Sequence, residues 1–316
     1  MWSESFGIAA HDGETIPVYR WRPTGLPRAV VVVSHGLGEH ALRYGATSAA
    51  LVRAGYAVYA NDHRGHGLAV TGRDMLGDFG RGGFEALVAD LQQVVWLASM
   101  ENPGAPIFLL GHSLGAYVAQ LYILDNSSSL AGVMMSGGAA LDMRLKSVPK
   151  SRAGLSAGDG TSEGESAAFG WLSRDPAVVD QYMDDPLCGF DESPSARRSL
   201  GAIAPRLCDR SELRRIKSDL PILMMTGERD PLNGFLRSFR TQVGRYAGAG
   251  LVGVCERVYP GARHEILNET NRTEVIADMV AWMEGVIGAG TGFADTRRAV
   301  PGCYRTVQRT AHRYDA

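Results

Sequence analysis

Continuous apolar runs that alternate with helical patterns constrain the fold of this chain more than any other feature. At 29–34 the sequence reads Ala, four Val and Ser, without the polar positions of a half-exposed strand. Such runs are typical of strands that are buried on both faces of a sheet. Similar runs lie at 56–61, 107–111, 130–136, 222–226 and 252–258. Helical patterns separate them, at 46–54, 83–100, 116–125, 233–246 and 270–286.

Strands that alternate with helices predict an α/β fold in which helices cover both faces of a mostly parallel sheet. Before the first buried strand, segments 4–10 and 15–22 flank an Asp-Gly pair, which is a hairpin signal. The alternation stops between about 139 and 220, where a Gly/Ser-rich stretch at 151–166 precedes short helical patterns. We expect this block to be an insertion over the functional edge of the sheet.

These patterns divide the chain into four parts. We expect a first core segment at 1–138, a helical cap at 139–219, a second core segment at 220–287 and a polar C-terminal extension at 288–316. The extension carries five arginines against two aspartates, and we expect it to be solvated or to dock a partner, for example a second copy of the chain.

Charge and hydropathy exclude several classes of protein. With 32 Lys and Arg against 34 Asp and Glu, the chain has no global positive field that would attract nucleic acid. The apolar runs are far shorter than the ~18 residues of a membrane-spanning helix, and the first residues lack the basic and apolar regions of a signal peptide. We therefore expect a cytoplasmic protein that makes at most peripheral membrane contact, through the cap.

Gly-x-Ser-x-Gly, the pattern of a nucleophile elbow, occurs three times, around Ser113, Ser156 and Ser162. The elbow requires a strand that enters the motif and a helix that leaves it, because the serine must sit on a strained turn with its hydroxyl exposed. Only Ser113 has this context, between the strand at 106–110 and the helical pattern at 116–124. The other two serines lie in the Gly/Ser-rich stretch, so we predict Ser113 as the nucleophile.

A serine hydroxyl needs a base to remove its proton, and in this architecture the base is a histidine that follows the nucleophile in the chain. Only His264 and His312 follow Ser113. His264 comes after the apolar run at 251–259 through a Pro-Gly turn, whereas His312 lies in the polar extension. We predict His264 as the base, with a structural histidine as the alternative.

The acid that orients the base should lie between Ser113 and His264 in the chain and should follow a strand. Asp230 does so, after the run at 221–226 and immediately before a proline. Its alternative role is that of an N-cap, a common use of aspartate before proline. Glu228 is the nearest rival, but it lies too close to the end of the strand.

The negative charge that develops on a carbonyl oxygen during acyl transfer needs preset donors. One is predicted to be the backbone N–H of Leu114, which follows the nucleophile. The other is predicted to be the N–H of Leu37, in the glycine-containing loop His-Gly-Leu-Gly-Glu-His at 35–40. A second loop, Asp-His-Arg-Gly-His-Gly at 62–67, is expected to brace the first.

We expect no metal and no cofactor. Glu39 and His40 resemble metal ligands, but no third ligand of suitable spacing accompanies them.

Four ordered motifs resemble those of the monoacylglycerol lipase and lysophospholipase branch of the α/β-hydrolases. They are the loops at 35–40 and 62–67, the elbow at 111–115, and one cap signature made of 172–179 followed by 185–187. The resemblance implies an eight-stranded sheet with one antiparallel strand, a cap inserted after the sixth strand, and a Ser-His-Asp triad. It also implies hydrolysis of carboxylic esters without a cofactor.

The cap departs from that family because the stretch at 150–166, where the lipases carry an apolar lid, is short and polar here. This favours a small-molecule ester with a short or medium acyl chain over a long-chain monoacylglycerol, while the resemblance keeps monoacylglycerols among the expected substrates. Candidate substrate contacts are the apolar side chains of the cap, each of which has simple packing as its alternative role: Phe169, Trp171, Leu172, Tyr182, Leu187 and Phe190.

The same triad would serve a lysophospholipase, a thioesterase or an amidase, because a fold does not determine the acyl donor. A non-catalytic sensor whose cap moves on ligand binding is the third possibility.

Overall fold

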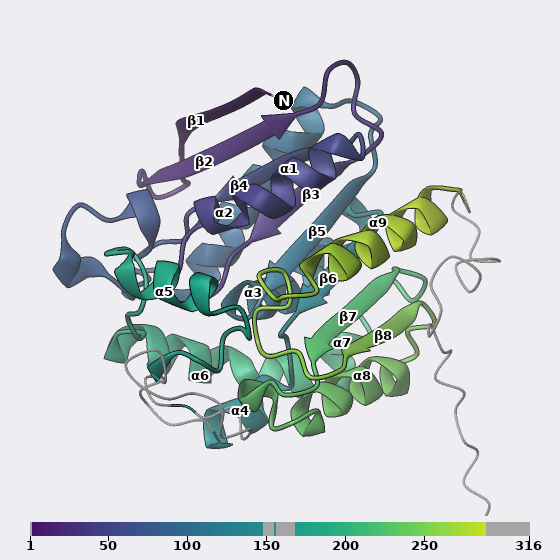
Figure 1. Ribbon diagram of the computed structural model, residues 1–316. Helices are drawn as coiled ribbons and strands as arrows, with labels where there is room; N and C mark the ends of the chain where they lie inside the picture. The colour runs from purple at the N-terminus through teal and green to yellow at the C-terminus, as the bar shows by residue number, and fades with distance from the viewer. Residues whose placement is uncertain (1, 148–154, 156–167, 289–316) are drawn as a thin grey trace, which may run out of the picture.

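The computed structural model describes residues 2–147, 155 and 168–288. Eight strands form one sheet in the order β1-β2-β4-β3-β5-β6-β7-β8 (Figure 1). They are β1 (Trp2–Ala9), β2 (Thr15–Arg22), β3 (Val30–Ser34), β4 (Ala57–Asn61), β5 (Ile107–His112), β6 (Gly132–Ser136), β7 (Ile222–Gly227) and β8 (Val254–Tyr259). Strand β2 is antiparallel to both of its neighbours, and the pairs from β4 to β8 are parallel. The predicted sheet, with its N-terminal hairpin and one antiparallel strand, is confirmed.

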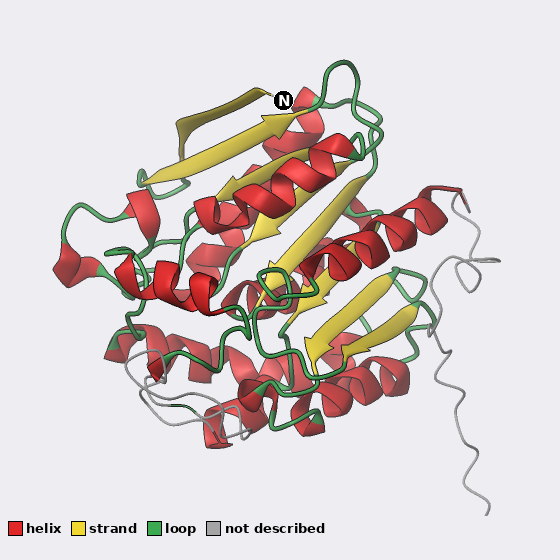
Figure 2. Ribbon diagram, in the orientation of Figure 1, coloured by secondary structure: helices red, strands yellow, loops and turns green. Residues whose placement is uncertain are grey.

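Helices lie on both sides of this sheet (Figure 2). They are α1 (Gly45–Arg53), α2 (Gly83–Glu101), α3 (Leu114–Asn126), α4 (Leu141–Ser147), α5 (Pro176–Asp184), α6 (Pro194–Cys208), α7 (Arg210–Leu213), α8 (Arg237–Ala249) and α9 (Arg272–Gly288). Helices α1 and α9 pack on one face, and α2, α3 and α8 pack on the other. Because α4 to α7 lie between β6 and β7 in the chain, the predicted insertion after the sixth strand is confirmed. Within the described residues, no helix is both long and apolar enough to cross a membrane.

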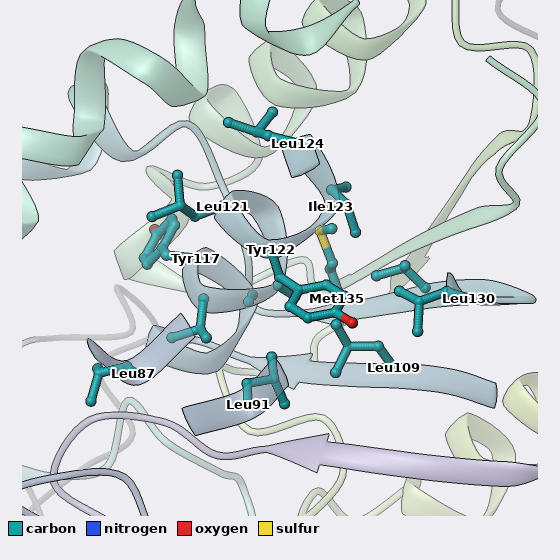
Figure 3. Close-up of a cluster of buried hydrophobic side chains, with 14 of the residues drawn as sticks. Leu87, Leu91, Leu109, Tyr117, Leu121, Tyr122, Ile123, Leu124, Leu130 and Met135 are labelled. Carbon is teal, nitrogen blue, oxygen red and sulfur yellow. The ribbon is translucent and has the colours of Figure 1, made fainter. Parts of the chain in front are cut away.

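Helix α3 is buried around its whole circumference, which explains why it can hold a strained turn at its start. Every side chain from Leu114 to Leu124 is buried, as expected for a helix that is apolar on all faces. Figure 3 shows Tyr122 of α3 beside Leu91 of α2 and Leu109 of β5, with Leu121 on another side of the helix next to Tyr117. The first residue of α3 is therefore fixed by close packing rather than by a surface loop.

The predicted helix at 233–246 begins later than expected. A short 3-10 helix, η6 (Pro231–Asn233), comes first, and α8 starts only at Arg237. Between them Phe235 and Leu236 have left-handed backbone angles, with φ of 50° and 76°. The side-chain oxygen of Asn233 accepts the N–H of Leu236 at 2.8 Å, and this local hydrogen bond competes with helix formation.

The first of the short helical patterns expected in the cap, at 165–172, is also different in the structure. Residue 168 is 3-10 helical and residues 169–172 form turns and a bend, while residues 165–167 lie outside the described part of the chain. The Gly/Ser-rich stretch lies outside it as well except for Leu155, as do Ser156, Ser162, His312 and the polar extension beyond Gly288.

Candidate active site

Ser113 occupies a strained turn between β5 and α3. Its backbone angles are φ 51° and ψ −109°, a conformation that costs a residue with a side chain about 1–3 kcal/mol and that is concentrated at functional sites. The side chain is 5% exposed, and its N–H donates to the carbonyl oxygen of Ser136 at 2.9 Å. The strand-turn-helix context predicted for this serine is present.

The two glycines of the motif are required by close backbone contacts. A Cβ atom on Gly111 would lie 2.4 Å from the carbonyl oxygen of Gly115. A Cβ atom on Gly115 would lie 1.9 Å from the carbonyl oxygen of Ser34, at the end of β3. The missing side chain of Gly115 thus lets the first turn of α3 lie directly against the start of the loop at 35–40.

Asp230 and His264 form a buried hydrogen bond. The distance from His264 Nδ1 to Asp230 Oδ2 is 2.8 Å, and the two residues are 2% and 0% exposed. A carboxylate accepts, so it places the ring proton on Nδ1 and leaves the lone pair on Nε2. The other oxygen of Asp230, Oδ1, accepts the N–H of Leu232 at 2.8 Å and caps η6. Asp230 therefore makes both of the interactions that its sequence context suggests.

Glu228, the rival acid, is exposed and accepts the N–H of Gly261 at 3.0 Å. Its carboxylate is thereby engaged on the surface of the loop that follows β8.

The ring of His264 lies at the same corner of the sheet as Ser113. It packs against His112, with ring centroids 4.8 Å apart, and against Trp171 of the cap, at 5.3 Å. A Cβ atom on Gly137 would lie 2.8 Å from His264 Cε1. Ser113 follows His112 in the chain, and its N–H bonds to Ser136, the residue before Gly137. Ser113 and His264 are therefore both next to His112 and Gly137. Burial, followed by the charge of His264, lowers the pKa of His112 to about 4, so His112 is neutral near pH 7.

The loop at 35–40 is braced by the loop at 62–67. The N–H of His63 donates to His35 Nε2 at 2.9 Å, and His35 Nδ1 lies 2.7 Å from the carbonyl oxygen of Gly36. Asp62 Oδ1 accepts the N–H of Ala41 at 2.9 Å. The side chains of Leu37 and Leu114, the predicted oxyanion donors, are 5% and 3% exposed.

A buried ionic network joins this loop to the loop of His264, and the sequence interpretation missed it. Arg43, in the 3-10 helix η1 (Ala41–Tyr44), lies 2.7 Å from Glu39 Oε2 and makes two contacts of 2.6 and 2.7 Å with the oxygens of Glu265. Its guanidinium carbon also lies 4.8 Å from the ring centroid of Tyr182 in the cap. Two local signals were available: the four-residue spacing of Glu39 and Arg43, and the position of Glu265 next to His264.

The cap is tied to the same loop by backbone hydrogen bonds. The carbonyl oxygens of Trp171 and Leu172 accept the N–H groups of His264 and Glu265, at 3.3 and 2.8 Å. Four of the six predicted cap contacts, Phe169, Trp171, Leu172 and Tyr182, form one apolar cluster with Leu232. The other two lie apart: Phe190 packs against His66 with ring centroids 5.1 Å apart, and Leu187 is half-buried in the turn after α5.

One further group of polar side chains spans the cap and the core. His40 lies beside Asp185 and Cys188, two cap residues that are distant from it in sequence. The expectation that Glu39 and His40 have no third ligand rested on spacing along the chain, whereas the fold brings two further side chains with potential ligand atoms beside His40.

The chain was compared with known proteins. The model of the family described as serine aminopeptidase, S33, matches residues 25–271. The chain belongs to this α/β-hydrolase family. A monoacylglycerol lipase of Mycolicibacterium smegmatis is 32% identical to it over 272 residues, which cover 83% of this chain and 90% of the lipase. The monoacylglycerol lipase of Paleococcus ferrophilus has a similar structure, with a TM-score of 0.64 at 25% identity over 86% of this chain and 99% of that one.

A thermostable carboxyl esterase from Bacillus coagulans shares the fold, with a TM-score of 0.79 at 24% identity over 91% of this chain and 99% of the esterase. The family and its members make the chain an enzyme of the serine hydrolase class, of the esterase and monoacylglycerol lipase type.

The ionic network gives a prediction about stability. Burial by itself raises the pKa of Glu265, but the Arg43 guanidinium outweighs it and holds the pKa at about 2. A folded-state pKa below the unfolded value stabilises the protein above the unfolded pKa, and that contribution is lost as the pH falls toward 2. Glu265→Gln should therefore lower the free energy of unfolding by about 3 kcal/mol at pH 7, because it removes one partner of a buried charge.

The difference between wild type and variant should shrink as the pH falls from about 5 to about 3. Urea unfolding at three pH values measures this. Glu14→Gln, a change at an exposed glutamate, is the control, expected to stay within about 0.5 kcal/mol at each pH. If Glu265→Gln lowers the free energy of unfolding by the same amount at every pH, Glu265 does not act through its charge.

Proposed function

We propose that this protein hydrolyses carboxylic esters through Ser113, His264 and Asp230, by way of an acyl-enzyme. The observation that carries the proposal is the buried hydrogen bond between His264 Nδ1 and Asp230 Oδ2, 2.8 Å long, at the corner where the strained Ser113 follows β5. A histidine whose Nδ1 is held by a buried carboxylate, beside an elbow serine, is the arrangement that acyl transfer requires.

The first half of the reaction forms a bond between Ser113 Oγ and the carbonyl carbon of the ester. His264 Nε2 takes the serine proton, and Asp230 stabilises the imidazolium through the Nδ1 proton. As the tetrahedral intermediate collapses, the bond to the alcohol breaks and the imidazolium gives its proton to the leaving oxygen. Water then attacks the acyl-enzyme by the reverse route and releases the acid and free Ser113.

The N–H groups of Leu37 and Leu114 are proposed to stabilise the oxyanion, each by about 3 kcal/mol. The contact of Gly115 with the backbone of Ser34 supports this role of the two N–H groups, because it brings the start of α3 against the loop that carries Leu37. The bracing by His35 and His63 holds that loop in place before substrate binds.

We propose short- to medium-chain esters or monoacylglycerols as substrates, in keeping with the monoacylglycerol lipases among the relatives. Trp171 packs against the catalytic ring and forms one cluster with Phe169, Leu172 and Tyr182, so we assign these four side chains to the acyl site. Phe190 and Leu187 lie outside this cluster and are the weaker candidates for substrate contact.

Ser113→Ala should lower kcat on p-nitrophenyl acetate by about 10⁴-fold or more, because no other atom can form the acyl-enzyme. Its Tm should stay within a few degrees of the wild type. Ser128→Ala, at an exposed serine, is the matched control and should keep full activity. Turnover by Ser113→Ala at the wild-type rate would refute the assignment, and no turnover by either protein would favour the sensor interpretation.

Asp230→Asn should lower kcat by on the order of 10⁴. The amide oxygen must face the Leu232 N–H, so the NH₂ group would face His264 Nδ1 and favour the wrong tautomer. Glu228→Gln serves as the control and should retain activity, since Glu228 is exposed. The acid is misassigned if Glu228→Gln proves the more damaging of the two, measured by steady-state kinetics on the same ester.

Acyl-chain preference tests the substrate class. We expect kcat/KM on p-nitrophenyl esters from C2 to C16 to peak between about C2 and C6, because polar and small residues occupy the stretch at 150–166. The same assay includes a monoacylglycerol, a lysophospholipid and a thioester of matched acyl length, with Ser113→Ala as the background. A rate that rises to C12 or beyond, or one that is highest on the lysophospholipid or thioester, would contradict the proposed substrate.

A further inference from the structure

Three side chains with different donor atoms meet where the cap contacts the loop at 35–40. His40 offers a ring nitrogen, Asp185 a carboxylate oxygen and Cys188 a sulfur, and these atoms all lie within 4.8 Å of one another. Among the described residues, no other group of three His, Cys, Asp or Glu side chains meets this criterion. His40 is buried, and the other two are half-buried.

We propose that His40, Asp185 and Cys188 form a binding site for a borderline-soft divalent cation such as Zn²⁺. Nitrogen, carboxylate and thiolate are the three ligand types that zinc uses in proteins, and they suit Mg²⁺ or Ca²⁺ poorly. Three protein ligands leave a fourth tetrahedral position for water. The proposal rests on the fold alone and is independent of the esterase assignment.

The backbone holds the ligands in place without the metal. Asp185 and Cys188 share one turn, in which the Cys188 N–H donates to the Asp185 carbonyl oxygen at 3.0 Å and the Leu187 N–H donates to Asp185 Oδ1 at 2.8 Å. The Gly189 N–H donates to the carbonyl oxygen of Gly38 at 3.0 Å, which fixes this turn against the loop that carries His40. The backbone therefore keeps the three side chains next to one another, and binding would bring their donor atoms, now within 4.8 Å, to the separation of about 3.5 Å that tetrahedral zinc ligands have.

His40 and Asp185 are already close to ligand geometry. His40 Nε2 lies 2.9 Å from Asp185 Oδ2, and two ligand atoms that each lie about 2.0–2.2 Å from one zinc ion need only slightly more separation. Binding replaces this hydrogen bond with two bonds to the metal. The Cys188 thiol loses its proton to the solvent, because the thiolate is the ligand.

Charged side chains of both signs surround the Cys188 sulfur. Burial raises the pKa of the Cys188 thiol, the Arg43 guanidinium acts against this, and the carboxylates of Asp185, Glu39 and Glu265 act with it. Arg43 is already paired with Glu39 and Glu265. The charge of a divalent ion would therefore be balanced by Asp185 and the Cys188 thiolate.

The direct test is titration of metal-free full-length protein with Co²⁺, which reports its ligands by absorption. We expect one ion per chain, a sulfur-to-metal charge-transfer band in the near ultraviolet, and loss of both signals when Zn²⁺ is added. Cys188→Ala should abolish the charge-transfer band and weaken binding by more than about 100-fold, since loss of an outer partner alone typically costs 10–100-fold.

Cys208→Ala is the matched control, because Cys208 is the other half-buried free thiol in the described part of the chain. It should bind Co²⁺ with the wild-type spectrum. Asp185→Asn should weaken binding while the charge-transfer band remains at saturation. If Cys188→Ala does not fold, Cys188→Ser provides the same test with a smaller change.

A stability measurement checks the position of the site. Zn²⁺ at about one hundred times its Kd should raise the Tm of wild type and Cys208→Ala by a few degrees, and should leave the Tm of Cys188→Ala unchanged. Absence of the charge-transfer band, or a band that both cysteine variants retain, would overturn the proposal. So would a rise in Tm that is the same in all three proteins.

Discussion

The contact between the first turn of α3 and the end of β3 determines the geometry of the rest of the site. It exists because Gly115 has no side chain: a Cβ atom there would lie 1.9 Å from the carbonyl oxygen of Ser34. The contact places the strained Ser113 beside the loop at 35–40. Helix α3 can hold this position because its side chains are buried on every face, so the strain at one residue is opposed by close packing along the whole helix.

A second constraint is electrostatic and links elements that are far apart in sequence. Arg43 lies between Glu39 and Glu265, and all three are nearly inaccessible to water. Buried charges are costly unless they are paired with good geometry, and removal of one partner leaves another uncompensated. The network therefore favours one relative position of the loop at 35–40, which carries Glu39, and the loop that carries His264 and Glu265.

The sequence was sufficient for those features whose signals are local. Uninterrupted apolar runs identified the buried strands, and the strand-serine-helix context singled out Ser113 from two other copies of the motif. The order of the loops along the chain pointed to Asp230 and His264, which the structure brings together.

Features that depend on which loops meet in space were not predictable from these patterns. Arg43 and Glu265 are 222 residues apart, and nothing in the periodicity indicates that they form a pair. The late start of α8 was missed for a different reason, because the Asn233 side chain competes with the backbone for one hydrogen bond. The two cap side chains beside His40 were missed because spacing along one loop says nothing about a segment that packs against it.

The position of the cap and the position of His264, the proposed base, cannot vary independently. The backbone of Trp171 and Leu172 accepts hydrogen bonds from the N–H groups of His264 and Glu265, and the Trp171 ring packs on His264. A change that shifts this part of the cap is therefore expected to shift His264 as well as the side chains that we propose for the acyl site. Substitutions at Trp171 should then alter kcat together with substrate preference, whereas substitutions at Phe190, which packs on His66 away from this cluster, should not disturb the base. The cap of this enzyme thus holds the loop of His264 in place as well as packing against it.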